Sequence, residues 1–150
     1  MTNKHYINNF ILVTSQEELD QVPHDSEDII VIKFGTYVQP AEIHDRVNVV
    51  VTGNYCVKAY GNSSIIANNG CDLELYGSSK AKVFMDCGVV AHDNSTVEAF
   101  DIYSNVKAFD NSLVRTIETP VYLHDKSKVI VYGDRPCEVH HEFDDDDLPY

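Results

Sequence analysis

The sequence predicts an all-β fold: a two-sided parallel β-solenoid with about 16 residues per coil and a small α/β cap at its N-terminus. Three observations predict it. Apolar residues recur every eight residues from Val49 onward. Each unit combines a short apolar/variable alternation, typical of a strand, with a Gly/Asp-Asn-Ser segment, typical of a turn. Alternate units also share features that their neighbours lack, which indicates that two units make one coil.

The first 48 residues are predicted to form the N-terminal cap. Phe10–Val13 is predicted to be a strand, and Ile29–Ile32 a second, buried strand. Between them, Ser15 and Glu18 have the spacing of a capping box, which predicts a short helix. A cap is expected here because an open solenoid end would expose unpaired strand edges.

Residues 49–136 are predicted to form the coils. Counting each opening apolar residue as position one, the units open at Val49, Val57, Ile65, Leu73, Ala81, Val89, Val97, Val106, Val114, Val121 and Val129. Every second unit has serine at position seven: Ser63, Ser79, Ser95, Ser112 and Ser127. A coil of three units would mix these serines with other residues. We therefore expect roughly five and a half coils and a rod of about 26 Å, wound right-handed by the usual crossover rule.

Residues 137–150 are predicted to form a C-terminal cap followed by an acidic tail. Val139 and Phe143 are expected to cover the last coil. The run Asp144, Asp145, Asp146 and Asp147 repels itself and favours a solvated tail, although it could also compete for a basic surface on a partner. An incomplete cover would favour a homodimer through the solenoid ends.

Charge and composition exclude several classes of function. The net charge of −13 argues against direct binding to nucleic acid or to an anionic membrane, because both would repel the chain. No apolar run approaches the roughly 20 residues needed to span a bilayer. The first residues lack the layout of a signal peptide, so a cytoplasmic location is expected and the four cysteines are expected to be free thiols.

A column of rings is the main candidate for a partner-binding surface. Position four of every second unit is a ring: Tyr60, Tyr76, His92, Phe109 and His124. If positions one and three point inward, these rings point outward, and aromatic side chains dominate interface hot spots. Lys58, Lys107 and Tyr122, at position two, would complete a mixed binding face. Alternatively, neighbouring rings only stabilise the parallel strands.

Position five is acidic in a run of successive units and glycine in several others. The acidic set is Asp93, Asp101, Asp110, Glu118 and Asp125, and the glycines are Gly53, Gly61, Gly77 and Gly133. Exchange between Gly and Asp indicates a backbone with unusual dihedral angles. Calcium binding or mimicry of phosphates is the alternative, but the repeat lacks the glycine-rich pattern of calcium-loaded β-rolls.

The remaining candidates for chemistry do not predict a catalyst. Cys71 and Cys87 share position seven and are expected to form a buried thiol ladder, since a zinc site would need closer cysteine pairs. The segment 137–141, with one cysteine and two histidines, is a second weak metal candidate. The pairs His92-Asp93 and His124-Asp125 match each other, which indicates repeat consensus rather than one active site. No catalytic residue, metal or cofactor is therefore predicted.

Three units carry a resemblance to known proteins: V-K-A-Y-G-N-S-S from Val57, L-E-L-Y-G-S-S-K from Leu73 and V-K-A-F-D-N-S-L from Val106. They resemble the short-repeat β-solenoid proteins of phage and bacterial origin over residues 49–136. Such rods are similar to compact repeat proteins that act by surface binding, including small phage-encoded inhibitors of bacterial defence systems. The resemblance implies a parallel solenoid and no catalytic motif.

These observations together lead to an expected function. The chain is expected to be a non-catalytic protein-binding module, most concretely a phage-encoded, anti-CRISPR-type inhibitor in the host cytoplasm. It would block a nucleic-acid-binding or assembly surface of a bacterial defence complex. The alternatives are a structural, self-assembling solenoid and a carbohydrate-binding module that uses the rings.

Overall fold

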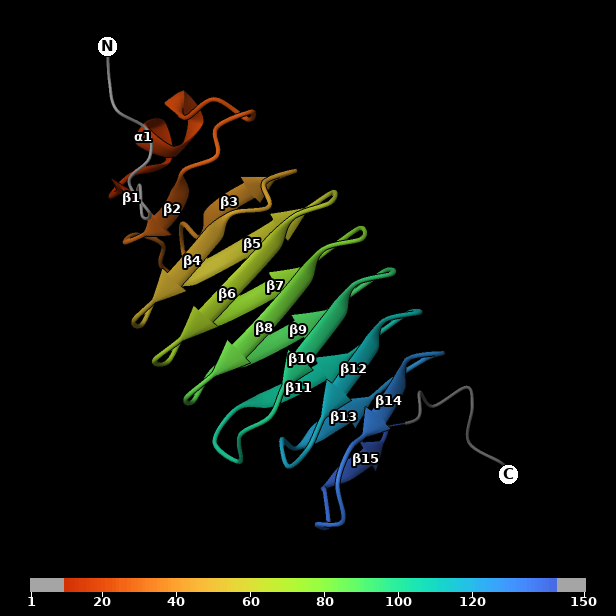
Figure 1. Ribbon diagram of the computed structural model, residues 1–150. Coiled ribbons are helices and arrows are strands. Elements are labelled where there is room, and N and C mark those ends of the chain that lie inside the picture. The colour runs from red at the N-terminus through yellow and green to blue at the C-terminus, as the bar shows by residue number, and fades with distance from the viewer. Residues whose placement is uncertain (1–9, 143–150) are drawn as a thin grey trace.

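The computed structural model describes residues 10–142 and confirms the two-sided parallel β-solenoid (Figure 1). Its helix is α1 (Gln16–Gln21). The strands are β1 (Phe10–Val13), β2 (Ile29–Ile32), β3 (Ala41–His44), β4 (Val49–Thr52), β5 (Cys56–Tyr60), β6 (Ser64–Asn68), β7 (Asp72–Leu75), β8 (Lys80–Phe84), β9 (Gly88–Ala91), β10 (Thr96–Ala99), β11 (Asn105–Ala108), β12 (Leu113–Thr116), β13 (Val121–Leu123), β14 (Lys128–Val131) and β15 (Val139–His141).

The strands form two parallel sheets that face each other. Sheet A has eight strands in the order β1-β2-β4-β6-β8-β10-β12-β14, and sheet B has seven in the order β15-β13-β11-β9-β7-β5-β3. Beyond β2 the chain alternates between the sheets, so each coil contributes one strand to each. Within sheet A, Ile65 pairs with Ala81 and Ala81 with Val97, which confirms that two octads make one coil.

The expected number of coils is wrong, because strands placed in the cap belong to the solenoid. Sheet A has eight strands, which gives about eight coils and a rod of roughly 34 Å, rather than five and a half coils and 26 Å. The predicted strands β1 and β2 pair with each other and extend sheet A, and β3 extends sheet B. Ala41 opens a unit one octad before Val49, so the repeat begins earlier than the sequence analysis placed it.

The helix α1 covers the N-terminal end of the core. Its N-cap is Ser15, whose Oγ accepts a hydrogen bond from the Glu18 amide at 3.1 Å, as the capping-box spacing predicts. At the other end, the buried Arg46 guanidinium donates to the carbonyls of Leu19 and Val22 at 3.0 and 2.8 Å. Arg46 therefore satisfies the Val22 carbonyl and gives a second donor to the Leu19 carbonyl, which also accepts from the Val22 amide. Burial lowers the pKa of Arg46.

The core is a narrow column of small and medium side chains. Positions one and three of each unit point inward, so that Val57 and Ala59, for example, are both buried. Each coil buries only a few side chains, and stability comes from stacking one coil on the next. Among residues 10–142 no helix is long and apolar enough to cross a membrane.

The corners of the coils are sealed by buried polar side chains. The position-seven serines form one column, and each donates its Oγ proton to the carbonyl three residues before it, for example Ser95 to His92 at 2.7 Å. At the opposite corner, Cys71 and Cys87 are fully buried and donate to Asn68 and Phe84. This confirms the buried thiol ladder, and all four cysteines are free. Hydrogen bonding with Cys87, together with burial, raises the pKa of Cys71.

The C-terminal coil is less covered than the others. Val131 occupies an inward position but is 39% exposed, whereas its counterpart one coil below, Thr116, is fully buried. Val139 on β15 is only partly buried. Phe143, predicted from the sequence to cover this end, lies outside the described residues.

Candidate functional site

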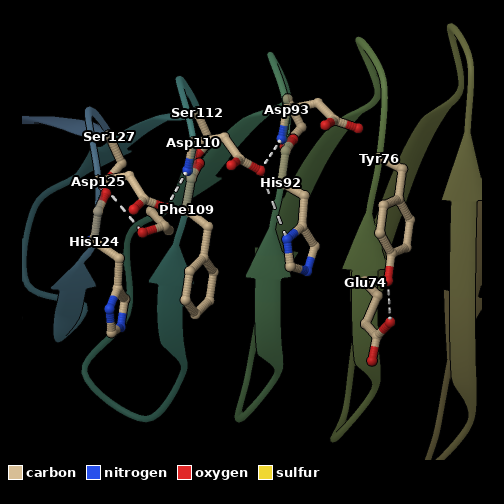
Figure 2. Close-up of polar contacts among 12 residues, drawn as sticks. Glu74, Tyr76, His92, Asp93, Phe109, Asp110, Ser112, His124, Asp125 and Ser127 are labelled. Atoms are coloured by element: carbon tan, nitrogen blue, oxygen red, sulfur yellow. Dashed lines mark hydrogen bonds and ion pairs between the residues drawn. The ribbon is translucent and has the colours of Figure 1, made fainter. Parts of the chain in front are cut away.

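The five predicted rings form one stacked column on the outer face of sheet B. Figure 2 labels Tyr76, His92, Phe109 and His124 of this column. Neighbouring ring centroids lie 4.2 to 5.2 Å apart, and the ring planes differ by no more than 14°. The column follows from the register, because position four of each sheet B strand lies directly above position four of the strand before it. The rings are half-buried.

The column has a sixth ring that the sequence analysis missed. His44 stacks on Tyr60 with centroids 4.7 Å apart. The segment Ala41-Glu42-Ile43-His44-Asp45 has the same pattern as the unit that opens at Val57, so the signal was present one octad before the first counted unit.

The stacking decides what the column can do chemically. Each inner ring is covered on both faces by its neighbours, so the ring edges are what face solvent. A sugar binds by lying on a free ring face, so this arrangement does not favour carbohydrate binding. Stacked aromatic pairs contribute about 0.5 to 1.5 kcal/mol each beyond the area they bury. The column therefore stabilises the stacked coils, which was the alternative left open by the sequence.

Polar neighbours fix the rings in place. The Tyr76 hydroxyl donates to Glu74 at 2.7 Å, and this bond raises the pKa of Tyr76 to about 12 (Figure 2). His92 Nδ1 lies 3.9 Å from a carboxylate oxygen of Asp110, which belongs to the next coil. These contacts hold the rings and link one coil to the next.

The three flanking residues lie beside the ring column, as predicted. Lys58 pairs with Glu74 at 3.7 Å, and Tyr122 stacks on His140 with centroids 4.7 Å apart. Lys107 is exposed and lines a small depression with Glu74. The mixed face therefore exists, but most of its charged and aromatic groups already have partners within the protein.

The position-five aspartates have a structural role in the sheet B turns. Asp93, Asp110 and Asp125 have φ of 58°, 57° and 55°, and Gly61 and Gly77 have φ of 68° at the same place. This confirms the backbone expected from the exchange between Gly and Asp.

Each of these carboxylates also bonds to the coil before it. Asp93 accepts from the Gly77 amide at 2.8 Å. Asp110 accepts from the Asp93 amide at 2.9 Å, and Asp125 accepts from the Asp110 amide at 3.1 Å (Figure 2). The two acidic residues of the opposite corner differ. Asp101 and Glu118 are not among the residues with positive φ, and Glu118 pairs with Arg135 at 2.6 Å.

The structure brings together no set of metal ligands within residues 10–142, where no group of three or more His, Cys, Asp or Glu could hold an ion. Cys137 donates to the Thr119 carbonyl at 3.2 Å. His140 lies 3.6 Å from Glu138 and stacks on Tyr122. These contacts connect the last coils.

A groove on the outer face of sheet A, named here the sheet A groove, was missed by the sequence analysis. It encloses about 530 Å³. At one end it is lined by the apolar residues Val47, Val50 and Ile66, and at the other by the cationic residues Lys80, Lys82 and Arg115. These residues stand at outward positions of strands that the repeat brings into register, whereas the predicted ring column and its flanking residues stand at outward positions of sheet B.

The remaining candidates, Asp144, Asp145, Asp146 and Asp147, lie outside the described residues.

Comparison with known proteins gave no match, whether with family models, with curated proteins or with solved structures.

Proposed function

We propose that the protein is a non-catalytic protein-binding module whose binding surface is the sheet A groove. One observation carries the proposal: apolar side chains stay exposed on a flat, regular face beside cations. Ile66 is 45% exposed and Val47 is 62% exposed, and both line the groove. Exposed apolar groups beside polar ones are typical of surfaces that bind another protein.

The contacts of the His and Asp residues support a non-catalytic role. His92 is stacked between Tyr76 and Phe109, and Asp93 accepts a hydrogen bond from a backbone amide of the preceding coil. These groups serve the stacking of coils, and they would need to leave those contacts to act on a substrate.

In its most concrete form, the proposal makes the partner a bacterial defence complex and the protein a phage-encoded inhibitor. The net charge of −13 and the acidic run at residues 144–147 support binding to a basic, nucleic-acid-binding surface of such a complex. The sheet A groove would hold an acidic or apolar segment of the same partner. The anti-CRISPR-type role rests on the resemblance of the repeat units to phage and bacterial solenoids.

The experiment that tests the proposal is affinity capture with matched baits. The wild type, Ile66→Ser, Lys82→Ala and the control Lys107→Ala, which changes a lysine of the opposite sheet, are each used on a bacterial lysate. The proposal predicts a protein that the wild type and Lys107→Ala retain and that both groove variants lose. Equal retention by all four baits would contradict a binding role for the groove.

The role of the ring column is tested separately with the double variant Tyr60→Ala/Tyr76→Ala. Because its inner rings have no free face, we expect this variant to keep partner binding once circular dichroism shows it folded. For the defence-complex version, the captured effector is assayed for target-DNA binding with and without the protein. Unchanged DNA binding at saturating protein would contradict that version.

Self-assembly through the C-terminal end is the second candidate function. It is favoured by the exposure of Val131, an inward-pointing residue of the last described coil, and by the unpaired outer edge of β14 within the described sheet. Light scattering over a concentration series tests it: a mass that stays that of a monomer at high concentration would contradict assembly.

A further inference from the structure

The outer face of sheet A changes its chemistry along the rod. Two columns of side chains point outward, at the first and third residues of most strands. Toward the N-terminal end they are mainly apolar, with Phe10 and Leu12 on β1, Val50 on β4 and Ile66 on β6. From β8 onward every second one of these side chains on average is a cation, and the others are Thr96, Glu98, Leu113 and Ile130. The face therefore has an apolar half and a cationic half, and the sheet A groove spans the border between them.

The cationic half stands out in a chain of net charge −13. The outward residues of β8, β10, β12 and β14 include four cations and one carboxylate: Lys80, Lys82, Arg115, Lys128 and Glu98. Glu98 lies 3.8 Å from both Lys82 and Arg115, so it is shared between two of the cations. The surface keeps an excess of positive charge, which fits an occupant with several carboxylates.

We propose that the C-terminal segment of this same chain, residues 143–150, docks on the sheet A groove. Its sequence is Phe-Asp-Asp-Asp-Asp-Leu-Pro-Tyr. The four aspartates bind over the cationic half, and Tyr150, at the end of the segment, contacts the apolar half at Ile66. The inference rests on the proposed function, since the segment would occupy the groove assigned to the partner and would regulate access to it.

The order of chemistry along the segment matches the order along the face. The last described strand, β15, lies at the C-terminal end of the rod beside β14 (Figure 1), and the cation nearest that end is Lys128 on β14. A chain that runs from there toward the N-terminal end passes the cations first and the apolar residues second. The acidic residues come first in the segment and the apolar residues last, so both kinds of contact form in a single direction.

The segment is also long enough. Eight extended residues span about 26 to 29 Å. In sheet A, β14 and Ile66 on β6 are separated by four strand spacings, or about 19 Å. Because the segment starts after β15 in sheet B, the remaining length of about 7 to 10 Å carries the chain around the corner to sheet A, and only the end of the segment at Tyr150 reaches Ile66. A tether this short keeps the segment at a millimolar effective concentration beside the groove, so even weak contacts give substantial occupancy.

A single tryptophan reports docking in the full chain. The protein has no tryptophan, so Tyr150→Trp introduces a unique fluorophore at the end of the segment. Docking predicts blue-shifted emission and acrylamide quenching about twofold weaker than in a variant that also carries Asn at positions 144–147. Lys82→Ala and 1 M salt, which shortens the screening length to about 3 Å, should weaken docking, whereas the control Lys107→Ala should not.

Other occupants give different results. Emission typical of exposed tryptophan in every variant would overturn the proposal, because the end of the segment would then stay in solvent. This holds also if another segment fills the groove. Quenching that weakens only as the protein concentration rises would mean that a second copy supplies the segment, which would overturn docking within one chain. Protection that survives both the Asn variant and high salt would also contradict it, because the aspartates would then have no role.

The outcome is distinguishable from that of the proposed function. If the segment docks in nine of ten molecules, its release by Leu148→Ser/Tyr150→Ser, which keeps the four aspartates proposed to meet the basic surface of the partner, raises partner affinity about tenfold. If docking fails while Ile66→Ser still loses the partner, the protein-binding function stands and the inference falls. If docking is seen but groove variants keep the partner, the inference stands and the proposed binding surface is wrong.

Discussion

Replacing Asp93 separates the two roles that the structure gives to the position-five aspartates. Asp93 has φ of 58°, and its carboxylate accepts a hydrogen bond from the Gly77 amide of the preceding coil at 2.8 Å. Alanine removes the acceptor and tolerates this backbone poorly. Glycine removes the acceptor but tolerates the backbone, and asparagine keeps both properties. The three substitutions at one position therefore divide the total effect into its parts.

The magnitudes follow from these two contributions. An L-residue without a local hydrogen bond pays about 1 kcal/mol for the left-handed conformation. Loss of an exposed hydrogen bond to a carboxylate costs about 1 kcal/mol more. We expect Asp93→Ala to lower the free energy of unfolding by about 2 kcal/mol, Asp93→Gly by about 1 kcal/mol and Asp93→Asn by less than about 0.5 kcal/mol.

Unfolding followed by circular dichroism in urea or on heating measures these differences. For a chain of this size, 2 kcal/mol corresponds to a fall in Tm of about 4 to 8 °C. Asp25→Ala, at an exposed position without a positive φ, is the matched control and should change Tm by less than about 2 °C. If Asp93→Ala is no less stable than Asp93→Asn, the structural role assigned to these aspartates is wrong.

Three further predictions concern the core, a turn and a tyrosine. Val97 is fully buried at an inward position, so Val97→Ala should lower the free energy of unfolding by about 2 to 3 kcal/mol in the same assay. The control Val38→Ala changes a side chain that is 90% exposed and should cost less than about 0.5 kcal/mol. Equal losses would contradict the assigned core. Gly77→Ala should lower the free energy of unfolding by at least about 2 kcal/mol, because φ is 68° and the new Cβ would lie 3.1 Å from the Gly61 backbone. Gly88 has no positive φ, so Gly88→Ala should lower it by less. The reverse order would refute the turn geometry. The bond to Glu74 raises the pKa of Tyr76 to about 12. The stability that this bond provides is complete below the unfolded pKa of tyrosine, near 10, and is lost as pH rises toward 12. Tyr76→Phe should therefore remove one late step from the tyrosinate absorbance titration, and an unchanged titration would count against the bond to Glu74.

The sequence predicted the winding of the chain because the repeat carries its own register. The serines at position seven, such as Ser79 and Ser95, mark one corner of every coil, and only a two-octad coil places them in a column. Inward positions were predicted because alternation in a strand leaves one face for the core. The ring column was predicted for the same reason.

The first coils were harder to predict because their units depart from the repeat. Ala41 opens a unit of the repeat, but the segment 14–28 between β1 and β2 holds a helix and a loop in place of a strand of sheet B. Insertions of this kind interrupt the octad, although the strands on either side still pair. By their hydrogen bonding, β1 and β2 therefore belong to the solenoid, although the interrupted octad predicted a separate cap.

The sheet A groove could not be found from one unit at a time. Val50 and Ile66 each stand at an ordinary variable position, and Lys82 follows in the next unit. Their combination into one surface depends on strand register and on what the neighbouring strands leave uncovered. Likewise, the rings were found as a column, but the covering of each ring face by its neighbours depends on ring orientation, which the sequence does not encode position by position.

The measurement that most directly tests the winding is nuclear Overhauser contact between backbone protons of neighbouring coils. The described register places Ile66 beside Lys82 and Lys82 beside Glu98. Cross-peaks between those pairs are the predicted result. Cross-peaks that instead join Ile66 to Val90, as a coil of three octads requires, would contradict the two-octad coil and with it the columns on which both binding proposals depend.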